Sequence, residues 1–284
     1  MRNILKAAVF AVLLLAAAGC GRKSEPVSVM TFNLRLSPSD GFDGENCWPN
    51  RREAAVRMLS EVRPDLFGVQ ESTPAQSDYL EQNLPDYARY GASGEDAVDR
   101  GEANAIFWRK DRFDLIEQNT FWLSETPDTV SMGWDGAYRR TVVWARLFDR
   151  KTQREVFYFN THFDHVGSAA REESARLIAA RIAELAGDAA PVFVTGDFNV
   201  NYDDSSMDVM KEFLGGARED APETSYENTF HNWGALEDEP GEHLIDHIFY
   251  KNASPSEFKV LTGGYGAVWL SDHYPVVAKF SLQR

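Results

Sequence analysis

The sequence has few cysteines and lacks several motifs that identify common enzyme classes. Only two cysteines, Cys20 and Cys47, occur in 284 residues, so a disulfide framework is excluded and a hydrophobic core must stabilise the fold. HExxH, CxxC and GxxxxGK patterns do not occur, which excludes the usual zinc sites and the phosphate-binding P-loop. Hydrophobic residues make up 43% of the chain, and this share is enough for a large core.

Basic charge is also scarce. The chain has 29 Lys and Arg residues against 44 Asp and Glu residues, which gives a net charge of −15. Loss of residues 1–19 would remove two basic residues, Arg2 and Lys6, and no acid, so the charge would become −17. Such a charge repels long polyanions unless a local basic cleft or a bound metal ion overcomes it. Among phosphorylated partners, it therefore favours a small molecule or a short nucleic acid.

The N-terminus has the pattern of a secretory signal peptide. Arg2 and Lys6 flank the start of an apolar run over residues 7–18, and small residues lead to Gly19-Cys20. The run is too short to span a bilayer as a helix, and its end resembles a bacterial lipobox. We therefore expect residues 1–19 to be removed, Cys20 to carry lipid, and residues 20–26 to tether an exported protein to a membrane surface of the bacterial cell envelope. The alternative is an ordinary signal peptide with a chance cysteine.

Apolar and alternating segments predict the regular elements. The expected strands cover residues 27–34, 66–71, 103–108, 140–148, 156–160, 191–199, 244–250 and 275–280. Helical spacing predicts helices from residue 50 to the proline at 64, and over 75–84, 169–186 and 207–214. Strands and helices interleave, with some strands in direct succession, which favours a mixed α/β layered fold. No linker of Gly, Ser or Pro divides the chain, so we expect one domain over residues 27–284.

Polar residues gather at the ends of these predicted strands. The six clusters are Met30-Thr-Phe-Asn33, Val69-Gln-Glu71, Asn160-Thr-His162-Phe-Asp164-His165, Gly196-Asp197-Phe-Asn199, Ile245-Asp246-His247 and Ser271-Asp272-His273. Unpaired carboxylates beside buried strands are costly, so a shared metal ion is the simplest partner for them. Carboxylate and amide oxygens are hard ligands that favour Mg²⁺, Mn²⁺ or Ca²⁺ over zinc.

This ordered set resembles the endonuclease/exonuclease/phosphatase superfamily. The resemblance spans residues 29–280, and each motif is weak alone, whereas six in order are specific. Residues 121–125 and 43–48 further resemble a secreted bacterial branch. The resemblance implies a four-layer α/β sandwich with two central mixed β-sheets. It also implies hydrolysis of phosphoesters by in-line attack of water, with Mg²⁺ or Mn²⁺ as cofactor.

The resemblance implies a role for each site residue. Metal binding would fall to Glu71 as the main ligand, with Asn33 and Asp272 nearby. Catalysis would fall to five residues: Asp197 as the group that orients or deprotonates water, Asn199 as its helper, His162 and His273 as donors to phosphoryl oxygens, and Asp246 as the group that orients His273. Two of these residues could instead have purely structural roles: Asn33 could cap a turn, and Glu71 could stabilise a helix N-terminus.

Other residues are weaker candidates for the site. Substrate binding would involve Asn160, which could instead hold the cleft together, and Arg109 and Arg140, which could instead form surface ion pairs. Asp164 and His165 could act only to stabilise the loop after His162, and His247 fits packing in a sheet better than chemistry. Three tryptophans in loops, Trp48, Trp134 and Trp233, could stack on a ligand or anchor their loops.

The function most consistent with these features is a metal-dependent phosphoester hydrolase acting outside the cytoplasm, as a monomer. Cleavage of diesters and of monoesters both remain open. The alternative, from another class, is a catalytically silent protein that binds a phosphorylated ligand on the same fold. Such a protein should show gaps among the catalytic positions, and this sequence retains all of them.

Overall fold

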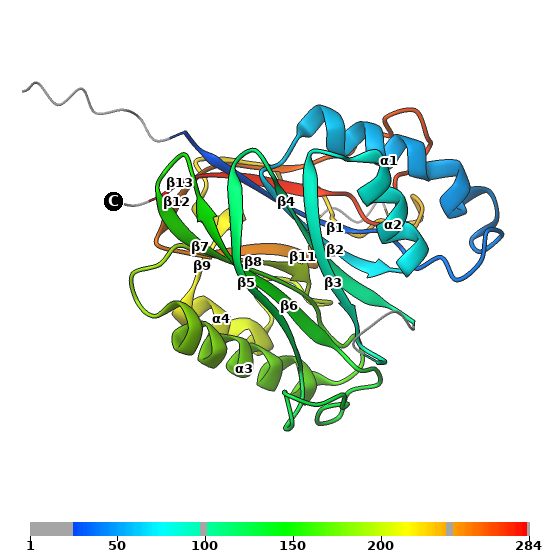
Figure 1. Cartoon of the computed structure of the whole chain (residues 1–284). Helices are drawn as coiled ribbons and strands as arrows, with labels where there is room; N and C mark the ends of the chain where they lie inside the picture. The colour runs from blue at the N-terminus through cyan, green and yellow to red at the C-terminus, as the bar shows by residue number, and fades with distance from the viewer. Residues whose placement is uncertain (1–24, 97–100, 237–240, 283–284) are drawn as a thin grey trace, which may run out of the picture.

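The computed structural model describes residues 25–96, 101–236 and 241–282 (Figure 1). The predicted signal peptide, Cys20 and most of the predicted tether lie outside the described residues. No helix within the described ranges is long and apolar enough to cross a membrane.

Two mixed β-sheets lie at the centre of the molecule (Figure 1). The first sheet has the order β10 (Glu223–Thr224), β12 (Ala253–Val260), β13 (Val276–Leu282), β1 (Val27–Asn33), β2 (Leu66–Ser72), β4 (Ala103–Arg109) and β3 (Tyr87–Ser93). The second sheet has the order β5 (Phe113–Trp122), β6 (Thr141–Asp149), β7 (Arg154–His162), β8 (Val192–Asp197), β11 (Asp246–Lys251) and β9 (Gly215–Gly216). Both sheets combine parallel and antiparallel pairs.

Helices cover the outer face of each sheet (Figure 1). On the first sheet lie α1 (Trp48–Val62) and α2 (Pro74–Asn83), and on the second lie α3 (Ser168–Ala186) and α4 (Asp208–Phe213). A short α5 (Ala217–Asp220) and two single turns, η1 (Gly44–Asn46) and η2 (Ser205–Met207), complete the helical elements of the described residues. The predicted four-layer α/β sandwich with two central mixed sheets is confirmed.

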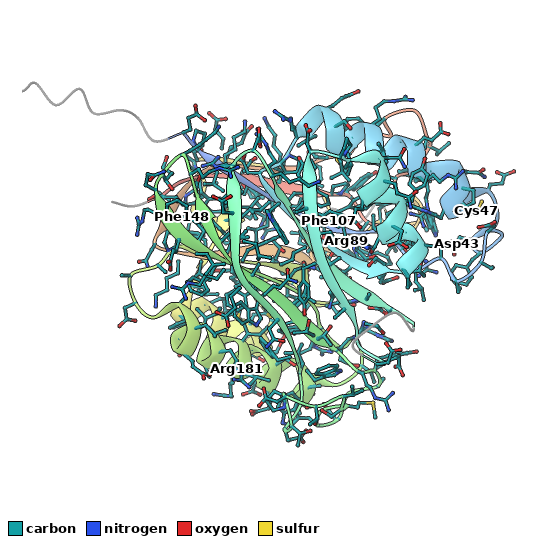
Figure 2. All side chains as sticks on the ribbon, in the orientation of Figure 1. Asp43, Cys47, Arg89, Phe107, Phe148 and Arg181 are labelled. Atoms are coloured by element: carbon teal, nitrogen blue, oxygen red, sulfur yellow. The ribbon has the colours of Figure 1, made fainter. Side chains whose placement is uncertain are left out.

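The alternation of side chains along the strands explains why the layers stack in this way. In β1, Val27 and Val29 face the core between the two sheets, whereas Met30 and Phe32 face the core beneath α1 and α2. A third core lies between the second sheet and its helices, where Ile178 of α3 is fully buried. Side chains fill the space between all four layers (Figure 2). Both faces of each sheet are therefore apolar, as a sandwich requires.

The strand directions bring one set of strand ends together. Parallel pairing joins β1 to β2 and β7 to β8. The neighbouring strands β13, β4, β6 and β11 run antiparallel to them. The C-terminal ends of the first group therefore meet the N-terminal ends of the second at one end of the sandwich, and all six polar clusters lie there. At the opposite end, the buried Arg112 forms ion pairs with Asp65 and Asp149.

Some element boundaries differ from the predicted ones. Helix α1 begins at Trp48, two residues before the predicted start, and Pro49 occupies its first turn, where a missing N–H is tolerated. Strand β7 begins earlier and ends later than predicted, at Arg154 and His162. Five strands were not predicted at all: β3, β5, β12 and the two-residue strands β9 and β10.

Candidate active site

A cleft of about 410 Å³ opens at the end of the sandwich where the polar clusters meet. Its lining residues come from both sheets and from the loops around them: Arg35, Leu36, Glu71, Glu102, Tyr138, Arg140, His162, His165, Asp197, Asn199, Phe230, Asn232, Ile245, Asp272 and His273. Every predicted catalytic residue except Asp246 lines the cleft directly. Asp246 lies behind His273.

Glu71 reaches the cleft because the backbone of β2 is distorted at this point. The register between β2 and β4 shifts between Val69 and Ser72, and Glu71 has a positive φ of 54°. Such a backbone is unfavourable for a residue with a side chain, and bulges of this kind redirect side chains near functional sites. The two carboxylate oxygens accept hydrogen bonds from Asn33 Nδ2 and from the Leu36 N–H, both at 3.0 Å.

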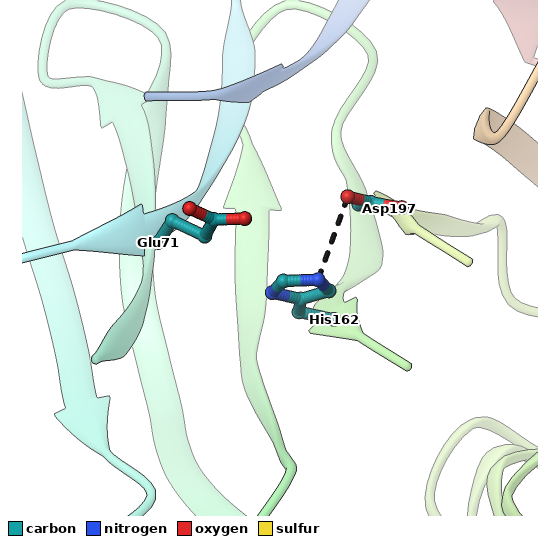
Figure 3. A group of neighbouring side chains, drawn as sticks. All are labelled: Glu71, His162 and Asp197. Carbon is teal, nitrogen blue, oxygen red and sulfur yellow. Dashed lines mark ion pairs between the residues drawn. The ribbon is translucent and has the colours of Figure 1, made fainter. Parts of the chain in front are cut away.

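Asp197 stands at the centre of the cleft, at the end of β8. Its Oδ1 accepts the N–H of Asn199 at 2.9 Å, and its Oδ2 accepts Asn33 Nδ2 at 3.0 Å. The same Oδ2 lies 3.4 Å from His162 Nε2 and 3.7 Å from His273 Nε2. The side chains of Glu71, His162 and Asp197 converge (Figure 3). A carboxylate held by two hydrogen bonds between two imidazoles is well placed to accept a proton.

Asp246 fixes the position of His273. Its Oδ2 lies 2.8 Å from His273 Nδ1, and both side chains are buried. Burial lowers the pKa of His273, but the carboxylates of Asp246 and Asp197 outweigh this effect and raise it to about 10. The two carboxylates therefore favour the protonated form of the ring. Because Asp246 holds the proton on Nδ1, the Nε2–H is free to donate into the cleft.

His162 has a comparable partner that the sequence analysis missed. Its Nδ1 lies 2.6 Å from Glu102 Oε1 and 2.9 Å from the Arg140 guanidinium. Burial and Arg140 lower the pKa of His162, whereas Glu102 and Asp197 raise it, and the net shift is upward. Burial also raises the pKa of Glu102, but His162 and Arg140 lower it to about 2. Glu102 directly precedes β4, and only the antiparallel direction of that strand brings this residue to the cleft.

Asp272 and Glu71 form the acidic side of the cleft. Burial raises the pKa of Asp272, His273 and Arg35 lower it, and the Glu71 charge raises it further, with a net upward shift. A cation between these two carboxylates would remove their repulsion, and oxygen donors of this kind suit a hard divalent ion. Ligand atoms of Glu71, His162 and Asp197 also lie within 4.8 Å of one another. The residues present therefore fit a divalent metal ion.

Asn33, which was predicted to bind the metal beside Glu71 and Asp272, also links the acidic side chains of the cleft. Its Oδ1 accepts the N–H of Arg35 at 2.9 Å, and its Nδ2 donates to both Glu71 and Asp197. Asn33 therefore bridges the two carboxylates and fixes their separation.

Asn160 differs from its predicted role in substrate binding. It is fully buried between the sheets. Its Nδ2 donates to the carbonyl oxygens of Val69 and Ala105, and its Oδ1 accepts Gln70 Nε2 at 2.6 Å. These bonds join β7 of the second sheet to β2 and β4 of the first. A Cβ atom at Gly68 would lie 2.2 Å from the Asn160 side chain, so a glycine is required for this contact.

The structure separates the two arginines that were expected to bind substrate. Arg140 lines the cleft beside His162. Arg109 is at the opposite end of β4, about 20 Å away for a seven-residue strand, where it pairs with Asp65 and Asp111. Because β4 runs antiparallel to β2, its C-terminal end points away from the cleft. Arg109 is therefore excluded from the site.

Several weaker candidates have structural roles. Trp48 and Trp233 pack against the buried guanidinium of Arg51, at 5.2 and 5.5 Å from their ring centroids. That guanidinium donates to backbone carbonyls beside the cleft, including those of Leu34 and Leu270. The ring of His247 is buried among aromatic side chains, and burial lowers its pKa to about 4. These residues hold loops and sheets in place.

The fold and the cleft define a class of protein: a four-layer α/β sandwich with acidic and imidazole groups gathered at one end of its sheets. Residues 30–273 match the Endonuclease/Exonuclease/phosphatase family, and the chain belongs to this family. Members of this family hydrolyse phosphoesters.

Solved structures of related proteins agree with this assignment. A family member from Bacteroides vulgatus is 32% identical with a TM-score of 0.85, over 91% of this chain and 99% of the other. A mannosyl-6-phosphatase from Bacteroides thetaiotaomicron is 34% identical with a TM-score of 0.83, over 89% of this chain and 99% of the other. TDP2 from D. rerio, in complex with a single-strand DNA product, is 18% identical with a TM-score of 0.70, over 90% and 98%, and shares the fold.

Proposed function

We propose that the protein is a divalent-metal-dependent phosphomonoesterase that acts as a monomer on small sugar phosphates, outside the cytoplasm. The observation that carries this proposal is the position of Asp197 between His162 and His273, in the same cleft as the carboxylates of Glu71 and Asp272. This arrangement places a proton acceptor, two proton donors and a cation site around one cleft. These groups are the ones that in-line attack of water on a phosphoester uses. The reaction then proceeds without a covalent intermediate.

The residues of the cleft divide the chemistry among them. Glu71 and Asp272 would hold Mg²⁺ or Mn²⁺, which when bound neutralises charge on the phosphoryl oxygens. Asp197 accepts a proton from the attacking water through Oδ2. His273 donates a hydrogen bond from Nε2 to a phosphoryl oxygen of the crowded transition state. The leaving oxygen takes up a proton from solvent as its bond to phosphorus breaks, which balances the proton that Asp197 accepts from the attacking water. Asn33 keeps Glu71 and Asp197 at a fixed separation, and Asn199 holds the Asp197 carboxylate in orientation.

Three observations favour a small sugar phosphate as substrate. The solved mannosyl-6-phosphatase is 34% identical over nearly its whole length. The cleft volume of about 410 Å³ suits a phosphorylated hexose better than a polymer. The net charge of −15 opposes binding of long polyanions. A catalytically silent binding protein is disfavoured, because the acid, base and donor groups are all present and mutually oriented.

The proposal is tested by phosphate release from purified protein lacking residues 1–19. We expect release from mannose 6-phosphate with Mg²⁺ or Mn²⁺, complete loss with excess chelator, and recovery when the metal is restored. The phosphodiester bis(p-nitrophenyl) phosphate should react at least about 100-fold more slowly, because a monoester presents the extra negative charge that the cation and His273 recognise. Preferential cleavage of the diester would reject the phosphomonoesterase assignment, and release unaffected by chelator would reject the metal.

The proposed location depends on the N-terminal sequence. The apolar run over residues 7–18 followed by Gly19-Cys20 supports export with lipid attached to Cys20. In a Gram-negative host, the full-length protein should be recovered in the membrane fraction, and the Cys20→Ser variant should lose the anchor. Equal recovery of both forms in that fraction would contradict the proposed lipid attachment.

A further inference from the structure

Two aromatic rings contact each other at the solvent-exposed edge of the cleft. Tyr138 and His165 both line the cleft and are both exposed to solvent. Their ring centroids lie 5.4 Å apart with an angle of 32° between the planes. The Arg140 guanidinium lies 5.5 Å from the Tyr138 ring, and the same guanidinium contacts His162. The two rings therefore adjoin the reacting groups on the outer side of the cleft.

A single buried carboxylate holds both rings in place. Asp164 Oδ2 accepts the N–H groups of Ala137 and Tyr138 at 2.8 and 3.0 Å. Its Oδ1 accepts those of Val166 and Gly167 at 2.9 and 2.7 Å. The loop that carries Tyr138 and the loop that carries His165 are thus fixed to one side chain. Rigid support of this kind is what a binding surface needs, because less conformational entropy is then lost on binding.

We propose that Tyr138 and His165 form a stacking subsite for the sugar ring of a sugar phosphate, with the phosphoryl group between Asp197 and Arg140. The inference rests on the proposed phosphomonoesterase function and names the part of the substrate that the cleft recognises. Aromatic rings pack well against the C–H face of a sugar, while their edges leave its hydroxyl groups free.

The geometry offers no slot for a planar base between the two rings. A base held between two rings needs parallel faces about 7 Å apart, which is twice the usual stacking distance. Tyr138 and His165 contact each other at a tilt, so they present one outer surface and no slot. Asn232, a polar side chain that lines the same cleft, suits the hydroxyl groups of a sugar.

The first test measures a specificity ratio. The ratio of kcat/KM for mannose 6-phosphate to that for glycerol 3-phosphate, which has no ring, should fall about tenfold in Tyr138→Ala, mainly through KM. Tyr138→Phe should keep the wild-type ratio, because the ring face and not the hydroxyl makes the contact. Tyr226→Ala is the matched control, since Tyr226 is exposed but is not a lining residue of the cleft. An unchanged ratio in Tyr138→Ala would overturn the subsite.

The second test does not depend on turnover. With Mg²⁺ present, calorimetric titration of the Asp197→Asn protein should give tighter binding of mannose 6-phosphate than of inorganic phosphate. Adding Tyr138→Ala or His165→Ala should reduce this difference about tenfold, and tighter binding of a nucleoside monophosphate than of the sugar phosphate would overturn the choice of sugar. If the difference exists without any hydrolysis by the wild type, the subsite stands and the proposed phosphomonoesterase function fails. If hydrolysis occurs but both rings are dispensable for binding, the subsite alone fails.

Discussion

Asp197→Asn is expected to lower kcat for phosphoester hydrolysis about 1,000-fold, with little change in KM. The substitution keeps the shape of the side chain and the hydrogen bond from Asn199, but it removes the negative charge that accepts a proton from water. Loss of a general base typically slows a reaction by factors of about 10² to 10⁴. Steady-state kinetics of phosphate release with saturating Mg²⁺ measure the effect.

The matched control for this prediction is Asp188→Asn. Asp188 is an exposed carboxylate after α3, at the opposite end of β8 from the cleft. Its replacement should leave kcat within twofold of the wild-type value. Thermal unfolding of both variants separates a chemical defect from a folding defect, because the Asp197→Asn protein should unfold within a few degrees of the wild type. A kcat near the wild-type value for Asp197→Asn would remove this residue from the mechanism.

The central strands could be predicted because burial on both faces makes them apolar along their length. The segment over residues 191–199 is an example, since all six residues of β8 are buried. Strand β5 shows why other strands were missed. Six of its residues in succession, Asp114 to Asn119, are exposed, because β5 lies at a sheet edge and packs little of its surface. Edge strands of this kind carry no alternating apolar signal.

The site residues were predicted from their positions at strand ends, and the errors in this prediction arise because strand direction was unknown. Asn33, Glu71, His162 and Asp197 come together as predicted, because parallel strands bring their C-terminal ends to one edge. Arg109 was placed wrongly because a sequence does not reveal that β4 runs antiparallel to β2. The same reversal brings Glu102, at the start of β4, to His162. Once the strand directions are known, the position of Glu102 in the cleft and the position of Arg109 outside it both follow.

Glu71→Gln is expected to raise the Mg²⁺ concentration for half-maximal activity by about 100-fold or more. Glu71 is a carboxylate that lines the cleft together with Asp272, and glutamine keeps its length while removing its charge. Neutral amide oxygens bind Mg²⁺ far more weakly than carboxylates, and even the loss of a residue that only hydrogen-bonds to a metal ligand lowers metal affinity or activity about 10- to 100-fold. Titration of activity with Mg²⁺ and calorimetric titration with Mn²⁺ measure the same loss by independent means.

Measuring Mn²⁺ binding in the absence of turnover distinguishes a metal ligand from a purely structural residue at Glu71. Glu71 also accepts hydrogen bonds from Asn33 and from the Leu36 backbone, and a glutamine oxygen can retain one of these. A purely structural role for Glu71 would lower the melting temperature and leave the Mn²⁺ affinity of the remaining folded protein unchanged. Glu117→Gln, at an exposed position on the edge strand β5, should change neither quantity. Wild-type Mn²⁺ affinity in a folded Glu71→Gln protein would show that the cation does not bind at Glu71. Asp197 would then act without a metal ion at that position in the cleft.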